Sequence, residues 1–515
     1  MNKLLVCVLQ AAWLTLCLGS ATAYADSAQV YKNNCSSCHG ADRLGGSGPA
    51  LLPESLARLR KADAVRTIEI GRAATQMPGF KESLTQPQID SLVDYIYAPL
   101  KTPPVWNAHQ IKASRSVTNK KLGDHPIFQA DMLNLFVVVE TGDHFATILN
   151  GDTFEPITRF PTRYALHGGP KFSPDGRYVY FSSRDGWVSK YDIWNLQTVA
   201  EIRVGINTRN IAISSDGRYV MAANYLPHDV VILNANDLSL IKIIPATDEK
   251  GQSSRVSAVY DAAPRKSFVV ALKDVPELWE ISYDDKAAPI YSGLVHDYKM
   301  GEGIATPGKF NPRRTPLESA LDDFFFDQSY THLIGASREG NAQVVNLNIR
   351  RKVADLELTG MPHLGSGITW ERGDQTVMAT PNLKEGLVTV IDMKNWQVVQ
   401  QIKTPGPGFF MRSHEKTPYA WTDVFMGKEK DTLQLIDKNT LEIAKTLTPS
   451  PGKTAAHVEF TRDGKYALVS IWENDGELVV YDAESLKEIK RIPMKKPSGK
   501  YNVYNKITRS SGTSH

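Results

Sequence analysis

A turn pattern recurs through residues 105–515 of this chain at steps mostly in the forties. In each copy a Val/Ile/Tyr/Phe-rich run ends in Asp or Asn, and an apolar residue follows four positions later. The clear copies are Asn150…Phe154, Asp192…Leu196, Asn234…Leu238, Asp392…Trp396, Asp437…Leu441 and Asp482…Leu486. Weaker copies lie near Ser282 and at Asn346. Successive copies are then separated by 42, 42, about 48, about 64, 46, 45 and 45 residues. Such a period with hairpin chemistry predicts β-propeller blades, and eight anchors predict eight of them.

A second repeated segment supports the same fold. SPDGRYVYF, SSDGRYVMA and TRDGKYALV occupy residues 173–181, 214–222 and 461–469, each a turn followed by a strand. A generic β-sandwich is the alternative, but its strands need not repeat this regularly. The longest excursion from the period lies between residues 283 and 345. We therefore expect residues 101–515 to form an all-β eight-bladed propeller.

The N-terminal 25 residues have the pattern of a secretory signal peptide. Lys3 is followed by an apolar run that ends in Ala23-Tyr24-Ala25, a small-x-small cleavage site. Cys17 would suit a lipid anchor, but the bulky Leu16 before it disfavours one. The run is too short for a good membrane span. We expect residues 1–25 to be removed on export to the periplasm, with no transmembrane segment left.

The mature chain of 490 residues keeps a formal net charge of +2, because only Lys3 leaves from the +3 total. That charge gives no reason to expect nucleic acid or an anionic membrane as partner. Cys35 and Cys38 are then the only cysteines left, in the pentapeptide CSSCH. A disulfide or a redox dithiol is the alternative. The adjacent His39 instead completes the C-x-x-C-H pattern of covalent haem c attachment, with His39 as iron ligand.

Residues 26–100 are expected to form the small all-α cytochrome c domain around that haem. Met77, followed by Pro78-Gly79, is the predicted second axial ligand, although a core-filling Met is the alternative. The segment 45–52 suits a loop whose proline carbonyl orients the His39 imidazole. A helix opening at Thr85 places apolar residues on one face, namely Ile89, Leu92, Val93 and Ile96. The domain is expected to end near Pro99, with KTPPVW as linker.

A C-x-x-C-H domain joined to an eight-bladed propeller resembles the cytochrome cd1 family. Matching segments run along the whole propeller: HGGPKFSPDGRYVYFSSRDGWVSKYDIW, VAEIRVGINTRNIAIS, PHLGSG and PSGKYNVYN. The resemblance implies a d1-type haem in the central channel, with His167 as its proximal iron ligand. His167 stands between small residues, where a backbone can approach a macrocycle.

Three further histidines are candidates for the distal side of that channel. His363 matches one distal-pocket histidine of the family, and His414 falls near the other. His457 stands one blade later, where the nitrite reductases of the family lack a histidine, and this departure favours a specialised catalytic role. A hydrogen-bonded strand histidine is the alternative for His457. By the same resemblance Arg184, Arg209 and Arg255 are expected to bind the d1 carboxylates, for which guanidinium groups are suited partners.

Three functions fit this resemblance. A cytochrome cd1 nitrite reductase reduces nitrite to nitric oxide, a dehydrogenase of d1 assembly oxidises a propionate to an acrylate, and a carrier only binds d1. Only nine residues separate the predicted cleavage site from Cys35, whereas many nitrite reductases carry a long arm there. The terminal KITRSSGTSH and the histidine pattern also resemble the dehydrogenase branch. The haem c motif argues against a carrier.

We therefore expect the oxidation of dihydro-haem d1 in the last step of haem d1 biosynthesis. Making CH=CH from CH2–CH2 removes two electrons and two protons. His363 or His457 is expected to act as general base, because imidazole titrates near neutral pH. Haem c holds one electron at a time, so a periplasmic c-type cytochrome is the expected acceptor, and nitrite reductase is a candidate recipient of the finished haem d1.

Overall fold

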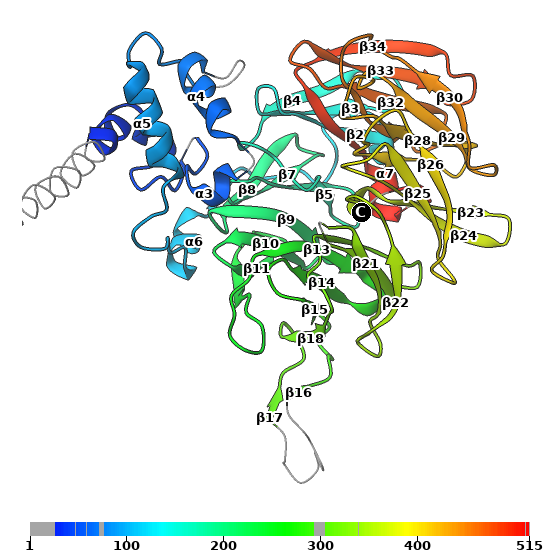
Figure 1. The fold of residues 1–515 in the computed structure, drawn as a ribbon, viewed down its shortest axis with the longest axis horizontal. Helices are drawn as coiled ribbons and strands as arrows, with labels where there is room; N and C mark the ends of the chain where they lie inside the picture. Colours follow the sequence, from blue (N-terminus) through cyan, green and yellow to red (C-terminus); the bar gives the residue numbers. More distant parts are fainter. Residues whose placement is uncertain are drawn as a thin grey trace, which may run out of the picture. The chain divides into compact units, whose positions relative to one another are not determined.

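The computed structural model describes residues 26–46, 48–57, 59–71, 77–292, 304–337, 339–509 and 511–513. The chain divides into two compact units between Val105 and Trp106 (Figure 1). The predicted linker, residues 101–106, spans this division. The predicted signal peptide, residues 1–25, lies outside the described residues.

The first unit is helical, as the sequence predicts. Residues 26–34 are helical, and the helices that follow are α2 (Ser36–His39), α3 (Pro53–Leu56), α4 (Lys61–Ile70) and α5 (Gln86–Tyr97). The predicted apolar face of α5 is buried, and its Leu92 and Ile96 pack with Tyr31 of the first helix. Gln88 Oε1 accepts the Thr85 N–H at 3.0 Å, a bond that caps the start of α5.

The second unit is an eight-bladed propeller, which confirms the predicted fold. Among the described residues, eight antiparallel sheets form the blades, and a separate two-stranded hairpin accompanies the fourth. Blade 1 consists of β35 (Pro497–Asn502), β2 (Leu135–Glu140), β3 (Phe145–Asn150) and β4 (Pro156–Pro161). Blade 2 consists of β5 (Lys171–Phe172), β6 (Tyr178–Ser182), β7 (Trp187–Asp192) and β8 (Gln197–Arg203), with β1 (Ser116–Val117) added outside. Blade 3 consists of β9 (Asn207–Ile213), β10 (Tyr219–Leu226), β11 (Asp229–Asn234) and β12 (Leu240–Pro245), and blade 4 of β13 (Val256–Ala262), β14 (Ser267–Leu272), β15 (Glu277–Ser282) and β18 (Pro312–Pro316).

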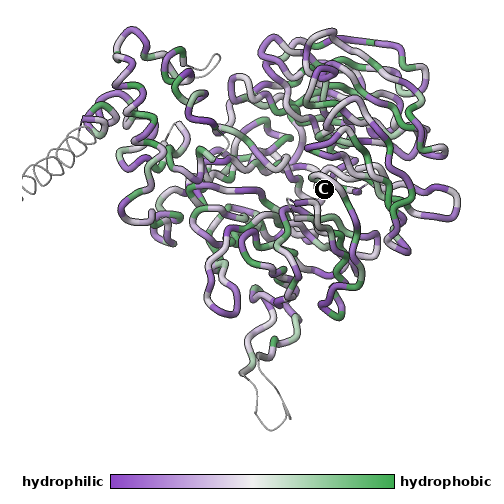
Figure 2. Tube along the Cα trace, viewed as in Figure 1, coloured by the Kyte–Doolittle hydropathy of each residue, from purple (hydrophilic) through white to green (hydrophobic). Residues whose placement is uncertain are grey.

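The remaining blades follow in chain order. Blade 5 consists of β19 (Asp323–Phe326), β20 (His332–Ala336), β21 (Asn341–Asn346) and β22 (Arg351–Glu357). Blade 6 consists of β23 (Ile368–Arg372), β24 (Gln375–Pro381), β25 (Leu387–Asp392) and β26 (Val398–Lys403). Blade 7 consists of β27 (Met411–Arg412), β28 (Tyr419–Asp423), β29 (Leu433–Asp437) and β30 (Ile443–Leu447), and blade 8 of β31 (Ala455–Phe460), β32 (Tyr466–Ile471), β33 (Gly476–Asp482) and β34 (Glu488–Met494). Short helices lie outside the blades: α6 (Ala108–Ser114), η1 (Met132–Asn134), η2 (Ala263–Arg265), η4 (Leu364–Ser366) and α7 (Val503–Thr508). Apolar residues run along the strands, and hydrophilic residues gather at the exposed turns (Figure 2).

The recurring turn of the sequence has one geometry. At its last position the backbone is left-handed, as in Leu238 (φ 58°), Trp396 (φ 61°) and Leu441 (φ 61°). The Trp396 N–H donates to the Asp392 carbonyl at 3.0 Å, and the Asp392 carboxylate accepts the Lys394 N–H at 2.7 Å. The turn favours Asp or Asn because the side-chain oxygen accepts backbone N–H groups of the turn that have no partner on a strand.

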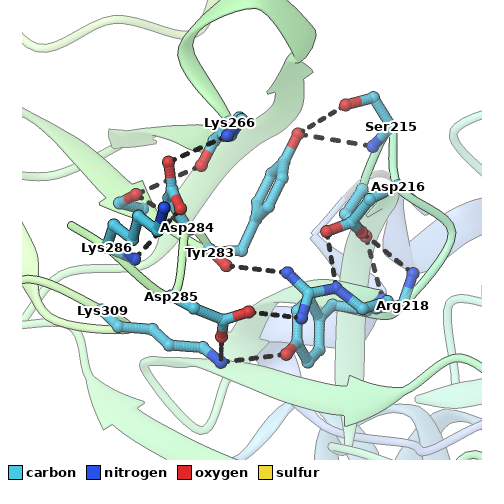
Figure 3. Close-up of polar contacts among 12 residues, drawn as sticks. Ser215, Asp216, Arg218, Lys266, Tyr283, Asp284, Asp285, Lys286 and Lys309 are labelled. Carbon is cyan, nitrogen blue, oxygen red and sulfur yellow. Dashed lines mark hydrogen bonds and ion pairs between the residues drawn. The ribbon is translucent and has the colours of Figure 1, made fainter.

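The long excursion lies inside one of these turns. Phe310 (φ 55°) donates its N–H to the Ser282 carbonyl at 2.8 Å, so residues 283–309 are inserted between the two ends of the turn. The insertion includes the hairpin of β16 (Ile290–Ser292) and β17 (Ile304–Thr306). Asp285 binds Arg218 at 2.8 Å and Lys309 at 2.5 Å, which ties the base of the insertion to blade 3 (Figure 3).

The two ends of the propeller sequence close the ring together. The last strand, β35, is the inner strand of blade 1 and pairs with β2. The chain then continues through α7, where Asn505 donates to Glu459 of blade 8 at 3.0 Å. Beyond α7, Arg509 binds Asp261 of blade 4 at 2.6 Å. Because these contacts reach blades on opposite sides of the ring, the C-terminal segment crosses the propeller at one end of its channel.

Candidate functional site

The haem c motif of the helical unit is arranged to hold an iron-porphyrin. The His39 Nδ1 donates to the Pro49 carbonyl at 2.8 Å, which leaves Nε2 as the ligand atom, as the sequence analysis expects of the loop at 45–52. Burial lowers the pKa of His39 and so favours the neutral form that binds iron. Cys35 and Cys38 are free thiols and partly exposed. These three residues fit a thioether-linked haem.

Met77 lies on a turn that follows α4. The Gly71 backbone is left-handed (φ 71°), and a Cβ there would stand 2.5 Å from the Met77 carbonyl, so the return of the chain requires glycine. The Phe80 N–H then donates to the Ile68 carbonyl at 2.9 Å. Residues 77–80 therefore lie beside the end of α4, and the role of Met77 as second axial ligand stays a prediction.

In the propeller, His167 lies between two of the predicted arginines. It belongs to the loop between β4 and β5, and its Nδ1 donates to the Arg209 carbonyl at 2.7 Å. Its Nε2 therefore accepts, and it lies 2.8 Å from Arg184 Nη2 and 2.9 Å from Arg209 Nη1. Three predicted residues from three different segments thus meet at one nitrogen atom.

Arg255 joins this group through an aromatic ring. The guanidinium carbons of Arg184 and Arg255 lie 5.8 and 5.5 Å from the centre of the Tyr225 ring, and Lys273 Nζ lies 5.6 Å from it. Arg255 is paired with Asp274 at 2.5 Å. Lys273 is likewise paired with Asp322. We call the three predicted arginines and Lys273, which gather next to His167, the cationic wall.

His363 and His457 lie on a continuous row of aromatic rings. The His363 ring is 4.4 Å from Phe409, the Phe409 ring is 4.6 Å from Phe410, and the Phe410 ring is 4.7 Å from His457. The row continues to Tyr501, whose ring is 5.1 Å from His457. We call these five rings the aromatic row.

The aromatic row and the cationic wall are within electrostatic reach of one another. Burial is the main cause that lowers the pKa of His363; the negative charge of Asp323 and the bond to Phe409 oppose it, and the positive charge of Arg209 adds to it. The pKa of His457 is lowered well below its usual range, again chiefly by burial. Both imidazoles are therefore neutral near pH 7 and able to accept a proton.

His457 has an unusual backbone and an unsatisfied side chain. Its φ is +50°, and it is skipped in the pairing of β31 with β32, where Ala456 faces Ser470 and Val458 faces Val469. It is a bulge residue, which turns its ring away from the ordinary strand direction. His457 is 8% exposed, and among the described residues its Nδ1 has no hydrogen-bond partner. Such a buried polar atom indicates a ligand.

The structure does not bring His414 to the aromatic row. Its Nδ1 accepts the Lys416 N–H at 3.2 Å, and its ring lies 6.0 Å from Phe460. A Cβ on Gly464, in the TRDG turn, would stand 2.2 Å from the His414 Nδ1. His414 is therefore packed against a turn of blade 8, and we leave it out of the site proposed below.

Several buried or half-buried polar residues near the aromatic row carry no signal in the sequence. Tyr501 and Lys500 belong to the quoted segment PSGKYNVYN, which signalled the family but no individual role. Asp423 lies behind the aromatic row, and burial raises its pKa to about 6. Burial lowers the pKa of Lys506 to about 7 and that of Lys171 to about 8. No local motif marks these residues, because they lie on segments that are far apart in the sequence.

Comparison with known proteins gives matches to both units. The family described as "Cytochrome D1 heme domain" matches residues 130–506, and "Cytochrome C oxidase, cbb3-type, subunit III" matches residues 22–96. The chain is 57% identical to a dihydro-heme d1 dehydrogenase of Pseudomonas aeruginosa over 94% of this chain and 95% of that protein. A nitrite reductase of Stutzerimonas stutzeri is 26% identical over 93% of this chain and 92% of its own.

The solved structures give the same result. The dihydro-heme d1 dehydrogenase NirN in complex with DHE superposes with a TM-score of 0.88 at 56% identity, over 94% of this chain and 100% of that one. Among the sequence relatives, Protein NirF of Pseudomonas aeruginosa is 29% identical over 71% of this chain and 90% of the NirF chain.

Proposed function

Because this chain belongs to the family of the cytochrome D1 heme domain and shares 57% identity with a dihydro-heme d1 dehydrogenase, we propose that it is itself a dihydro-haem d1 dehydrogenase. It oxidises a propionate side chain of the precursor to an acrylate. Among the described residues, none of the helices has the length and apolar character to cross a bilayer. The signal pattern at 1–25 supports the periplasm as its location.

The cationic wall is suited to hold the substrate. In the proposed complex the His167 Nε2 binds the iron of dihydro-haem d1, so Arg184 and Arg209 must release this atom. Their guanidinium groups are then available to the ring carboxylates, to which they can donate in pairs. Arg255 supplies a further cation at the Tyr225 end of the wall.

The aromatic row supplies the base. His363 donates from Nδ1 to the Phe409 carbonyl at 2.7 Å, so its Nε2 carries the lone pair. His457 has the buried, unpartnered Nδ1. In the proposed oxidation the CH2–CH2 group loses two protons and two electrons. One of these imidazoles takes the first proton, the other imidazole takes the second, and the electrons leave through haem c; Tyr501 is the hydroxyl next to His457. The observation that carries this proposal is the position of half-buried His363 and buried His457 on one aromatic row.

Electrons leave through the helical unit. When bound, haem c supplies a one-electron acceptor. Cys35 and Cys38 tether it, His39 holds its iron, and Met77 is the proposed second ligand. Two electrons must leave in turn, so we propose that a periplasmic c-type cytochrome accepts them. Nitrite reductase is the proposed recipient of the product. Residues 26–100 and 101–515 are the proposed cytochrome and propeller domains.

An anaerobic incubation tests the function. Protein with oxidised haem c and an excess of a soluble c-type cytochrome is mixed with dihydro-haem d1, and the extracted tetrapyrrole is analysed by mass spectrometry. We expect pigment that has lost two hydrogens, together with two equivalents of reduced cytochrome. Bound but unchanged pigment would identify a carrier. Rapid reduction of nitrite by the d1-loaded protein would identify a nitrite reductase.

A further inference from the structure

The bulge at His457 leaves its backbone groups without strand partners. An ordinary residue of β31 would exchange hydrogen bonds with β32, but His457 is skipped in that pairing. Buried N–H and C=O groups need partners, because an unpaired one loses its hydrogen bonds to water. Both partners of His457 are charged side chains from other blades.

Asp423 binds the N–H side. It ends β28, is 1% exposed, and its Oδ2 accepts the His457 N–H at 3.3 Å. Its Oδ1 accepts the N–H groups of Phe409 at 2.7 Å and Phe410 at 3.1 Å. One carboxylate therefore holds the histidine and the two central residues of the aromatic row.

Lys500 binds the C=O side. It lies on β35, is fully buried, and its Nζ donates to the His457 carbonyl and to Ser470 Oγ at 2.9 Å. A lysine is rarely buried completely unless its ammonium group has defined partners. The left-handed backbone of His457 is thus held from both sides, by the Asp423 carboxyl group at its N–H and by the Lys500 amino group at its carbonyl.

The same carboxylate reaches the second histidine. The Phe409 carbonyl accepts the His363 Nδ1–H at 2.7 Å, while the Phe409 N–H donates to Asp423. A continuous chain of hydrogen bonds therefore runs from His363 through Phe409 and Asp423 to His457. This chain of contacts holds the ring of His363 through its Nδ1 and the backbone of His457 through its N–H.

We propose that Asp423 and Lys500 are positioning residues that clamp the backbone of His457, and that Asp423 also fixes His363 through Phe409, so that the two imidazoles are presented to the tetrapyrrole as a pair. The proposal rests on the proposed function only for the turnover measurement. The competing explanation is that Asp423 and Lys500 only stabilise the fold and do not position the imidazoles.

Asp392 is a matched control for that explanation. It is also a buried aspartate at the end of a strand, 3% exposed, and it accepts the N–H groups of Lys394 at 2.7 Å and Asn395 at 3.2 Å. It belongs to an outer turn of blade 6 and contacts neither histidine. Asp392→Asn therefore perturbs the same kind of hydrogen bond without touching the clamp.

The turnover experiment compares Asp423→Asn, Lys500→Met and Asp392→Asn in the holo-protein. We expect kcat to fall by about 10–100-fold in the first two, as for other changes that loosen the support of a reacting group. The Kd for dihydro-haem d1, from optical titration, should change little, and Asp392→Asn should keep the wild-type kcat. Should Asp423→Asn fail to fold, Lys500→Met decides alone. Wild-type kcat in Lys500→Met, or an equal fall in Asp392→Asn, overturns the proposal.

A second measurement does not depend on turnover. Ring-nitrogen NMR of protein labelled with 15N-histidine, in its reduced form, reports the hydrogen bond at the His363 Nδ1 and the environment of His457. We expect both sets of signals to shift in Asp423→Asn, and chiefly those of His457 in Lys500→Met. Unchanged signals in both variants overturn the clamp. The two proposals can fail separately. If the signals shift in the variants as expected but the wild-type protein leaves dihydro-haem d1 unoxidised, the clamp stands and the proposed function is contradicted.

Discussion

His363 donates from Nδ1 to the carbonyl of Phe409, and the two rings also touch, with 4.4 Å between their centres. The bond selects one tautomer, in which Nε2 is the basic atom. A histidine that merely filled the core would have no need of this orientation. The relationship therefore links a backbone carbonyl of blade 7 to the tautomer of the proposed base at the start of blade 6.

The base assignment predicts the effect of removing either imidazole. His363→Ala and His457→Ala should each lower kcat by about 10²–10⁴-fold, the usual contribution of a positioned acid or base. Binding of dihydro-haem d1 should persist, since His167 and the arginines are unchanged. Stopped-flow turnover and optical titration measure the two effects. His125→Ala, at a side chain that is 88% exposed, is the control. Wild-type turnover in both variants would remove the assignment.

The haem c motif predicts a separation of binding from oxidation. Replacing Cys35 and Cys38 by serine should abolish covalent haem, because both thioethers are lost. The propeller should still bind dihydro-haem d1, but no acrylate should form without an electron exit. Haem staining of denaturing gels and mass analysis of the pigment measure the two properties. Acrylate formation by the haem-free protein would contradict the proposed electron route.

The cationic wall predicts losses in affinity. Arg184→Gln and Arg209→Gln should each weaken binding of dihydro-haem d1 by about 10–100-fold, since hydrogen bonds to charged groups contribute about 1.5–3 kcal/mol. Arg218→Gln, in the network at the base of the insertion, is the matched control and should bind as the wild type does (Figure 3). Optical titration under anaerobic conditions gives the three Kd values. Equal affinities would argue against these arginines as carboxylate partners.

The lowered pKa values predict the pH profile. A base must be unprotonated, and burial lowers the pKa of both His363 and His457 below the usual 6.5. The kcat of the wild type should therefore be flat across neutral pH and fall only on the acid side of pH 6.5. A series of single-turnover rates from pH 5 to pH 8 measures this. A rise in rate centred above pH 7 would point to a different titrating group.

The buried ion pair of blades 7 and 8 predicts a large effect on stability. Arg412 and Glu459 lie 2.6 Å apart with side chains 4% and 1% exposed. Glu459→Gln leaves a buried guanidinium without its counter-charge and should lower the free energy of unfolding by about 3–5 kcal/mol. The exposed pair of Lys61 and Asp94 is the control, since Asp94→Asn should cost at most about 1 kcal/mol. Thermal denaturation followed by circular dichroism compares the two.

Much of the fold could be predicted because its information is local. A single Asp sets each outer turn, as at Asp392 and Trp396, and its spacing in the sequence gives the blades. The haem c motif and the helix after Thr85 are equally local. The candidate histidines were found by resemblance, but only the structure separates His414, packed against Gly464, from His363 and His457.

The support of the site could not be predicted in this way. Asp423, Lys500 and His457 meet from three strands, and no spacing along the chain announces their contact. The bulge at His457 also cannot be predicted from the alternation of side chains along a strand. One extra residue moves the following side chains to the opposite face of the strand. The copy of the repeated turn near Ser282 was also weak in the sequence. Residues 283–309 are inserted into it, and Phe310 completes the turn that begins at Ser282.

The position of β35 sets the order in which the molecule can mature. Lys500 and Tyr501 lie on a strand that follows blades 2 to 8 along the chain, yet both contact His457. A nascent chain without residues 497–515 has every blade but the first in full, and no finished place for a tetrapyrrole. The CSSCH segment, in contrast, emerges early and needs none of the ring. Haem c can therefore be installed before the propeller has closed, whereas the pigment must wait for the final strand.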